Sequence, residues 1–192
     1  MCFHLDGVTG NTVTDASGNG FDGVIRGARS TDVMPQVFVV KHGSLGGTEW
    51  RYNTATPATG WMKVEFDDTS WKQNVSGFGS KLSTYIRSSW TTEKIFTRTT
   101  FELKKTPTEA TLHVRHDGEA TVYLNGVQVA YFDGYSHFYE RRALTASQLA
   151  LLKAGSNLIA VKCHNAGTQG PSNPGYLDVG VSVDDSVVSG SF

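Results

Sequence analysis

The chain has 192 residues, of which 39% are hydrophobic and 18% charged, and its formal net charge is −1. No block of basic residues supplies the phosphate attraction on which nucleic-acid binding depends, and no apolar run approaches the ~18 residues of a membrane-spanning helix. The residues after Met1 lack the basic and apolar regions of a signal peptide. We therefore expect no nucleic-acid partner and no membrane span, and we interpret the chain as an internal piece of a longer protein.

The N-terminal stretch contains a glycine-rich loop, TDASGNGFDG, at residues 14–23. Asp15, Asn19 and Asp22 carry side-chain oxygens of the kind that calcium binds, but the bidentate glutamate of an EF-hand is missing because position 26 is Arg. The other interpretation is a turn between two short strands, in which the glycines supply positive φ. The sequence favours the turn and leaves a structural calcium as the open alternative.

Strand patterns dominate the chain after this loop. Asn125–Gly126 lies between two alternating runs and is a strong hairpin signal, because both turn positions need positive φ. In residues 110–116, Leu112 and His116 share one face of the predicted strand, whereas His113 and Arg115 share the other. The other predicted strands are residues 37–41, 94–103 (one strand or two), 157–165 and 176–183.

Helical signals are few. One stretch predicts a helix with Thr145 as N-cap and Gly155 as the C-terminal stop. A second short turn is predicted where Asp67 or Asp68 accepts backbone N–H groups and Trp71 anchors the turn in the core. The pattern predicts an all-β protein, a β-sandwich jelly roll with one or two short helices.

The sequence contains none of the local motifs that mark common catalytic sites. His113 and His116 are three residues apart on a strand and therefore point to opposite faces, which argues against a zinc site built on this pair. The two cysteines, Cys2 and Cys163, are too few for a disulfide scaffold, and Cys163 lies in an apolar stretch typical of a small core residue. We expect the chain not to be an enzyme, and the sequence leaves open whether the two cysteines pair.

Aromatic residues in polar loops are the stronger functional signal. A sugar has an apolar C–H face and a rim of hydroxyls, so its site combines an exposed aromatic ring with hydrogen-bonding side chains. The alternative is that these aromatics fill the core, as most large aromatics do, but the polar neighbours of Trp90 and Tyr135 favour exposure of these two. The candidates are Tyr85, Arg87 and Trp90 in one loop and Tyr135, His137 and Tyr139 in another.

Two strand ends add further candidate ligand-binding residues. His116 and Asp117 precede a glycine between two strands, and Asp117 either binds a ligand or closes the turn, which is the common role of an Asp-Gly pair. His164 and Asn165 end a strand before a loop rich in Gly, Pro and Asn, and loops of that kind often carry binding residues.

The motifs GWMKVEFDDTSW, KIFTRTTFEL, LHVRHDGEATVYLNGVQVA, LLKAGSNLIAVKCHN and YLDVGV follow one another in order. Together they resemble the galactose-binding-domain-like β-sandwich modules of bacterial glycoside hydrolases, including the sugar-binding domain of family 2 enzymes. The resemblance covers residues 47–183. It implies a jelly roll that accompanies the catalytic domain of a secreted, cell-surface or periplasmic enzyme. Many such modules bind carbohydrate in loops at one end, others have only a structural role, and some hold a structural calcium.

Residues 3–28 resemble instead the opening of a laminin-G/concanavalin-like lectin domain. We therefore expect residues 1–44 to be an N-terminal extension, either a partial lectin-like segment or added strands, and residues 45–192 to be the jelly-roll module. The expected function is carbohydrate binding as a non-catalytic accessory module of a polysaccharide-degrading enzyme. The alternative is a purely structural or interaction domain that packs beside the catalytic domain.

Overall fold

The structure is a computed structural model that describes residues 36–80, 83–165 and 175–184, together with the backbone of three short strands nearer the N-terminus. Contacts divide the chain into two units, Met1–Val33 and Met34–Phe192. In the first unit, β1 (Val8–Thr9), β2 (Thr12–Val13) and β3 (Gly23–Val24) form a small antiparallel sheet. The predicted calcium residues Asp15, Asn19 and Asp22, and also Cys2, lie outside the described residues.

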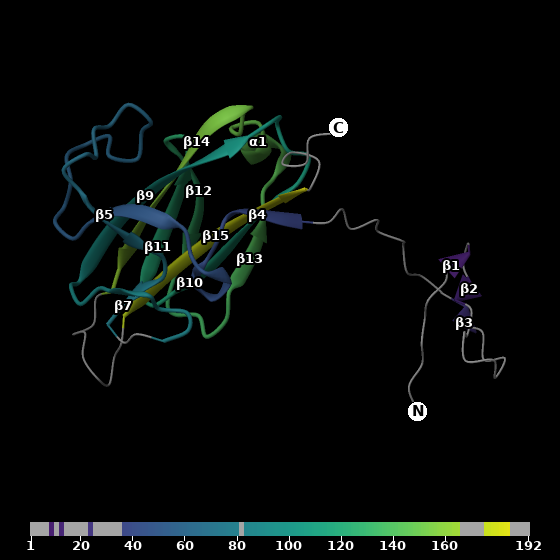
Figure 1. Cartoon of the computed structure of the whole chain (residues 1–192), viewed down its shortest axis with the longest axis horizontal. Coiled ribbons are helices and arrows are strands. Elements are labelled where there is room, and N and C mark those ends of the chain that lie inside the picture. The colour runs from purple at the N-terminus through teal and green to yellow at the C-terminus, as the bar shows by residue number, and fades with distance from the viewer. Residues whose placement is uncertain are drawn as a thin grey trace. The chain divides into compact units, whose positions relative to one another are not determined.

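The second unit is an all-β sandwich of two sheets, which confirms the predicted fold class (Figure 1). The first sheet has the order β13-β10-β15-β7-β8, with β4 also paired to β15, and the second has the order β12-β11-β14-β9-β5-β6. The first sheet consists of β4 (Gln36–Val40), β7 (Phe78–Gly79), β8 (Ser88–Ser89), β10 (Ala110–His116), β13 (Glu140–Ala143) and β15 (Tyr176–Asp184). The second consists of β5 (Glu49–Asn53), β6 (Lys72–Val75), β9 (Lys94–Leu103), β11 (Glu119–Leu124), β12 (Val127–Phe132) and β14 (Gly155–His164).

The main core lies between the two sheets and follows the period-2 pattern of the strands. Leu112 and His116 of β10 are fully buried on the inner face, as the alternation predicted, and Arg115 faces the other way. The opposing sheet contributes buried residues such as Val161 and Cys163. Cys163 is thus a core residue, as expected, and its thiol is free.

A second, smaller core covers the outer face of the second sheet. Trp61 and Trp71, from the segment between β5 and β6, pack against Phe96 and Ala160. Asp67 accepts the Thr69 N–H at 3.0 Å, so the predicted turn and its tryptophan anchor are confirmed.

The predicted hairpin and helix start are also present. Asn125 and Gly126 have φ values of 48° and 89° between β11 and β12. Thr145 caps α1 (Ala146–Leu149) with a capping box. The predicted helix end was wrong, because α1 stops at Leu149 and Gly155 instead begins β14. The described part of the chain contains no helix with the length and apolar character needed to cross a bilayer.

The strand over residues 36–40 belongs to the sandwich, because β4 pairs with the Val181–Asp184 end of β15. It is followed by the short 3-10 helix η1 (Gly43–Leu45). The two compact units divide between Val33 and Met34, and the domain division after residue 44 stays a prediction. That the first unit is a partial lectin-like segment stays a prediction.

Candidate functional site

A cleft of about 530 Å³ with aromatic walls lies over the outer face of the first sheet. Its base comes from strands β4, β10 and β13, and its walls come from η1, from the loop before β8 and from the loop before β13. We call it the cleft. Its lining residues are Phe38, His42, Leu45, Tyr85, His113, Arg115, His137, Phe138, Tyr139 and Arg141.

A buried carboxylate behind the cleft holds two of its walls. Asp178 of β15 is 1% exposed, and its oxygens accept the Gly43 N–H at 2.8 and 3.0 Å. The same carboxylate accepts the Tyr139 hydroxyl at 2.6 Å. Burial raises the pKa of Asp178 to about 6 and also raises the pKa of Tyr139. Glycine is required at position 43, because a Cβ there would lie 2.0 Å from the Tyr85 carbonyl oxygen.

Two histidines of the cleft are uncharged at neutral pH. His42 stacks on Tyr139 with ring centroids 4.1 Å apart, and His113 lies 4.7 Å from the Phe38 ring. The Nε2 atom of His113 is 2.8 Å from the Ser182 hydroxyl. Burial lowers the pKa of both histidines, that of His113 to about 4. Both rings are therefore neutral at pH 7.

The positive charge of the cleft comes from two arginines. The Arg115 guanidinium carbon lies 5.1 Å from the Tyr85 ring and 4.9 Å from the Tyr176 ring. Its buried Nε has no hydrogen-bond partner among the described residues. Arg141 is exposed and sits beside His113 in the β10–β13 register. No Asp or Glu is among the described residues that line the cleft.

Exposed aromatic rings form the outer part of the cleft. Tyr85 is 42% exposed and Phe138 is 83% exposed. Tyr135, which is 64% exposed, makes an edge contact with His137 at 5.1 Å and lies next to the cleft without lining it. A flat apolar ligand face therefore has rings available near two guanidinium groups.

The structure brings together only part of the predicted aromatic candidates. Tyr85, His137 and Tyr139 line the cleft, and Arg87 supports it by donating from Nε to the Gly43 carbonyl at 2.7 Å. The expectation that Trp90 is exposed was wrong, because its side chain is 1% exposed. Its indole N–H donates to Thr92 Oγ1 at 2.9 Å and to the Lys94 carbonyl at 3.2 Å, so the polar neighbours satisfy a buried ring.

The four candidates at the strand ends do not line the cleft. His116 is fully buried, with Nδ1 2.7 Å from the Gly118 carbonyl oxygen and Nε2 3.1 Å from Glu140 Oε1. Asp117 accepts the Asn165 amide at 3.2 Å, and burial raises the pKa of Asp117. His164 Nε2 lies 2.7 Å from Glu93 Oε1. These contacts connect His116, Asp117 and His164 to partners within the fold, and the choice between ligand binding and turn closure for Asp117 stays open.

Sequence reasoning missed seven of the ten residues that line the cleft. For two of them a signal existed, since the alternation of residues 110–116 placed His113 and Arg115 together on the face that turned out to be the outer one. The missed residues are Phe38, His42, Leu45, His113, Arg115, Phe138 and Arg141, of which Leu45 contributes only an apolar rim.

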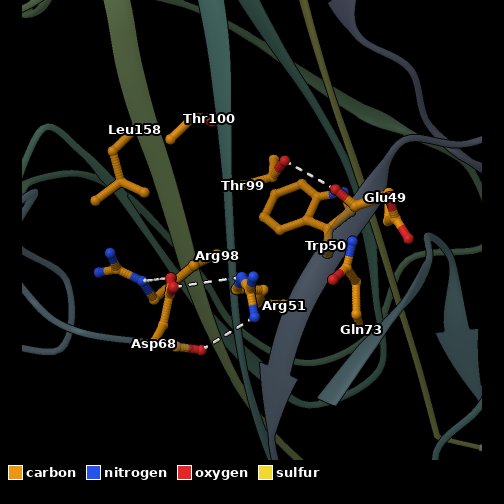
Figure 2. Close-up of a pocket in the computed structure, with 9 residues that line it drawn as sticks. All are labelled: Glu49, Trp50, Arg51, Asp68, Gln73, Arg98, Thr99, Thr100 and Leu158. Carbon is orange, nitrogen blue, oxygen red and sulfur yellow. Dashed lines mark hydrogen bonds and ion pairs between the residues drawn. The ribbon is translucent and has the colours of Figure 1, made fainter. Parts of the chain in front are cut away.

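A second concavity, of about 280 Å³, lies over the second sheet and is shown in Figure 2. We call it the arginine pocket. Asp68 lies between two arginines, 2.6 Å from Arg98 Nε and 3.4 Å from Arg51 Nε. Its lining residues are Glu49, Trp50, Arg51, Asp68, Gln73, Arg98, Thr99, Thr100 and Leu158.

The protein itself occupies the donors of the buried arginine in this pocket. Arg98 is 4% exposed, and besides Asp68 it donates to the carbonyls of Trp61, Lys63 and Phe66. These three carbonyls belong to the segment that covers the second sheet, so Arg98 fastens that segment to β9. The arrangement is structural, although the pocket also contains polar groups.

Within the described ranges, no group of three or more His, Cys, Asp or Glu side chains could hold a metal ion. Burial raises the pKa of the Cys163 thiol, which disfavours the reactive thiolate.

Parts of several solved β-glucuronidases have a similar fold. One from Bacteroides uniformis is 18% identical over 77% of this chain and 18% of that chain, with a TM-score of 0.54. Bacteroides uniformis β-glucuronidase 2 is 18% identical over 78% of this chain and 18% of that chain, with a TM-score of 0.51. The Ruminococcus gnavus enzyme is 14% identical over 81% of this chain and 30% of that chain, with a TM-score of 0.50.

The chain thus spans less than a third of the length of these proteins, and at such identities the similarity shows the fold alone. No protein-family model matches the chain, and no curated protein matches it either.

Proposed function

We propose that this chain is a non-catalytic, carbohydrate-binding accessory domain of a larger glycoside hydrolase, and that the cleft is its binding site. The sandwich would be of the galactose-binding-like jelly-roll type that its sequence motifs resemble. The solved proteins with a similar fold are β-glucuronidases, and the fold corresponds to a small part of each. An adjacent catalytic domain and a secreted, cell-surface or periplasmic bacterial location follow from the same proposal.

The observation that carries the proposal is the composition of the cleft. Tyr85 and Phe138 present exposed ring faces, which suit the apolar face of a sugar. Arg115, His137 and Arg141 supply donors at the same site, which suit a rim of hydroxyls. The volume, about 530 Å³, lies in the range of small-ligand sites.

The candidate binding residues that do not line the cleft have either a supporting or a structural role in this proposal. Tyr135 and Arg87 extend or support the cleft wall. Trp90, His116, Asp117, His164 and Asn165 have partners within the fold, and we assign them a structural role in this proposal.

A second candidate function is the docking of the adjacent catalytic domain on the same surface. The observation that favours it is the presence of two exposed rings in the loop before β13, Tyr135 at 64% and Phe138 at 83%, because exposed apolar side chains that lie together often mark an interaction surface. A docked domain and a bound glycan would compete for these rings.

The test is affinity electrophoresis of the 192-residue chain through gels that contain plant, algal or host polysaccharides. We expect retardation by at least one polymer, and we expect Tyr85→Ala and Phe138→Ala to weaken it about tenfold each, since stacking contacts contribute on the order of 1–2 kcal/mol.

The matched control is Tyr131→Ala, because Tyr131 is 45% exposed on β12 of the other sheet and lies outside the cleft. If Tyr131→Ala reduced the retardation as much as Tyr85→Ala, the binding site would not be the cleft. No retardation by any polymer would overturn the proposal and leave the docking function.

A further inference from the structure

We infer that the glycan bound in the cleft is acidic, and that its carboxylate or sulfate group pairs with Arg115 and Arg141. The inference rests on the proposed function, because it names the class of sugar that the same site would take. It comes from the balance of charge in the cleft and from the hydrogen bonds that its arginines leave unmade.

Arg115 has a hydrogen-bond donor, its Nε, that no described residue uses. Its guanidinium carbon lies 5.1 Å from the Tyr85 ring and 4.9 Å from the Tyr176 ring, and contact with two rings restricts the orientation of the group. The Nε atom is buried and unpartnered among the described residues, and a buried donor without an acceptor costs free energy. Because Arg115 lines the cleft, an anionic oxygen of a ligand there would accept from this guanidinium.

Arg141 supplies the second positive charge. It pairs with His113 across β10 and β13 and lines the cleft, whereas its neighbour Arg142 donates to the Tyr131 carbonyl and sits 4.3 Å from the Phe132 ring. Within the described part of the chain, the side chain of Arg141 has no ion-pair or hydrogen-bond partner. Its charge is therefore available to a ligand.

The surroundings compensate these two charges only in part. None of the described lining residues is acidic. Asp178 lies opposite Arg115 in the β10–β15 register and interacts with it electrostatically, but the same carboxylate also accepts from Gly43 and Tyr139. A neutral sugar would leave an excess of positive charge beside it. A carboxylate or a sulfate matches the two guanidinium groups in charge and in bidentate geometry.

The experiment compares polymers that differ only in charge. Polygalacturonate and its methyl ester form the carboxylate arm, and dextran sulfate and dextran form the sulfate arm. We expect the 192-residue chain to bind at least one acidic polymer tenfold or more tightly than its neutral counterpart, with an affinity that falls as salt is added. Which arm responds identifies the anionic group.

Arginine variants show whether the charge preference belongs to the cleft. Arg115→Gln and Arg141→Gln should each weaken binding of the acidic polymer about tenfold and leave any binding of the neutral polymer unchanged. Arg142→Gln is the matched control, since it removes the same charge one residue away on a side chain directed elsewhere. Circular dichroism of each variant verifies that the sandwich is folded.

The outcomes separate the inference from the proposed function. Neutral polymers bound as tightly as acidic ones, with Tyr85→Ala still weakening them, would overturn the inference and keep the proposed function. Equal losses in Arg141→Gln and Arg142→Gln would show general attraction to polyanions and would also overturn the inference. Binding of no polymer at all would overturn both.

Discussion

The two sheets of the sandwich each carry arginines beside aromatic rings, yet the two places differ in how the guanidinium groups are used. In the arginine pocket, all three nitrogens of Arg98 donate to atoms of the protein, and Asp68 supplies the counter-charge. In the cleft, Arg115 keeps an unpartnered nitrogen, and no described lining residue is acidic. The presence of arginine and aromatic residues is therefore not enough to indicate a binding site, whereas the unused donors are informative.

The same contrast appears in burial. Arg98 is 4% exposed and is covered by the segment that contains Trp61 and Trp71. Arg141, Tyr85 and Phe138 face solvent. The arginine pocket thus stabilises the fold. The exposed side chains of the cleft contribute less to stability. Variants at each place should separate the two roles.

The largest effect is expected for Arg98→Ala. Removal of the guanidinium leaves the Trp61 carbonyl without this donor and leaves Asp68 with Arg51 alone, and breaking a buried ion pair costs about 3–5 kcal/mol. Because Asp68 is partly exposed, at 21%, we expect a loss of about 3 kcal/mol in the free energy of unfolding, measured by urea denaturation.

Arg51→Ala is the control for this prediction. Arg51 reaches the same carboxylate at 3.4 Å but is 37% exposed, so its removal should cost less than about 1 kcal/mol. Equal losses for the two variants would contradict the structural role assigned to Arg98.

A smaller effect, dependent on pH, is expected for His113→Gln in the cleft. The folded-state pKa of His113 is about 4, below its ordinary value of 6.5, so its contribution to stability is lost as pH falls from 6.5 toward 4.

The contribution of Asp178 to stability changes with pH in the opposite direction. Its folded-state pKa of about 6 lies above its ordinary 3.8, so its contribution is present at low pH and is lost as pH rises through 6.

Glutamine removes the histidine titration and keeps a polar partner for Ser182. Between pH 7 and pH 4.5, the free energy of unfolding of the variant should therefore shift in its favour by about 2 kcal/mol relative to the unmodified chain. Urea titrations at the two pH values measure this shift. Parallel stability profiles would show that His113 titrates normally in the folded chain.

The parts of the fold that sequence predicted well are those with local causes. The Asn125–Gly126 turn depends on two positive φ values, and the faces of β10 depend on alternation alone. The missed strand β13 has only exposed residues and no apolar alternation, so its pairing with β10 depends on its place in the sheet.

The cleft was predicted only in part for a similar reason. Tyr85, His137 and Tyr139 were accessible to sequence reasoning because they lie in polar loops. Phe38 and Arg141 reach the same cleft only because β4 and β13 pair with β15 and β10, which no local pattern specifies. Trp90 shows the converse, since its polar neighbours satisfy a buried indole instead of marking an exposed one.

The smallest effect on stability is expected for Phe138→Ala, and it completes the contrast with Arg98. A ring that is 83% exposed contributes little buried area, so its truncation should change the free energy of unfolding by less than about 0.5 kcal/mol, whereas the proposed function predicts weaker glycan binding. Urea denaturation of the variant beside the unmodified chain measures this difference. A loss above about 1 kcal/mol would mean that Phe138 packs within the folded domain in solution, and the ring would then not be available to a ligand in the cleft.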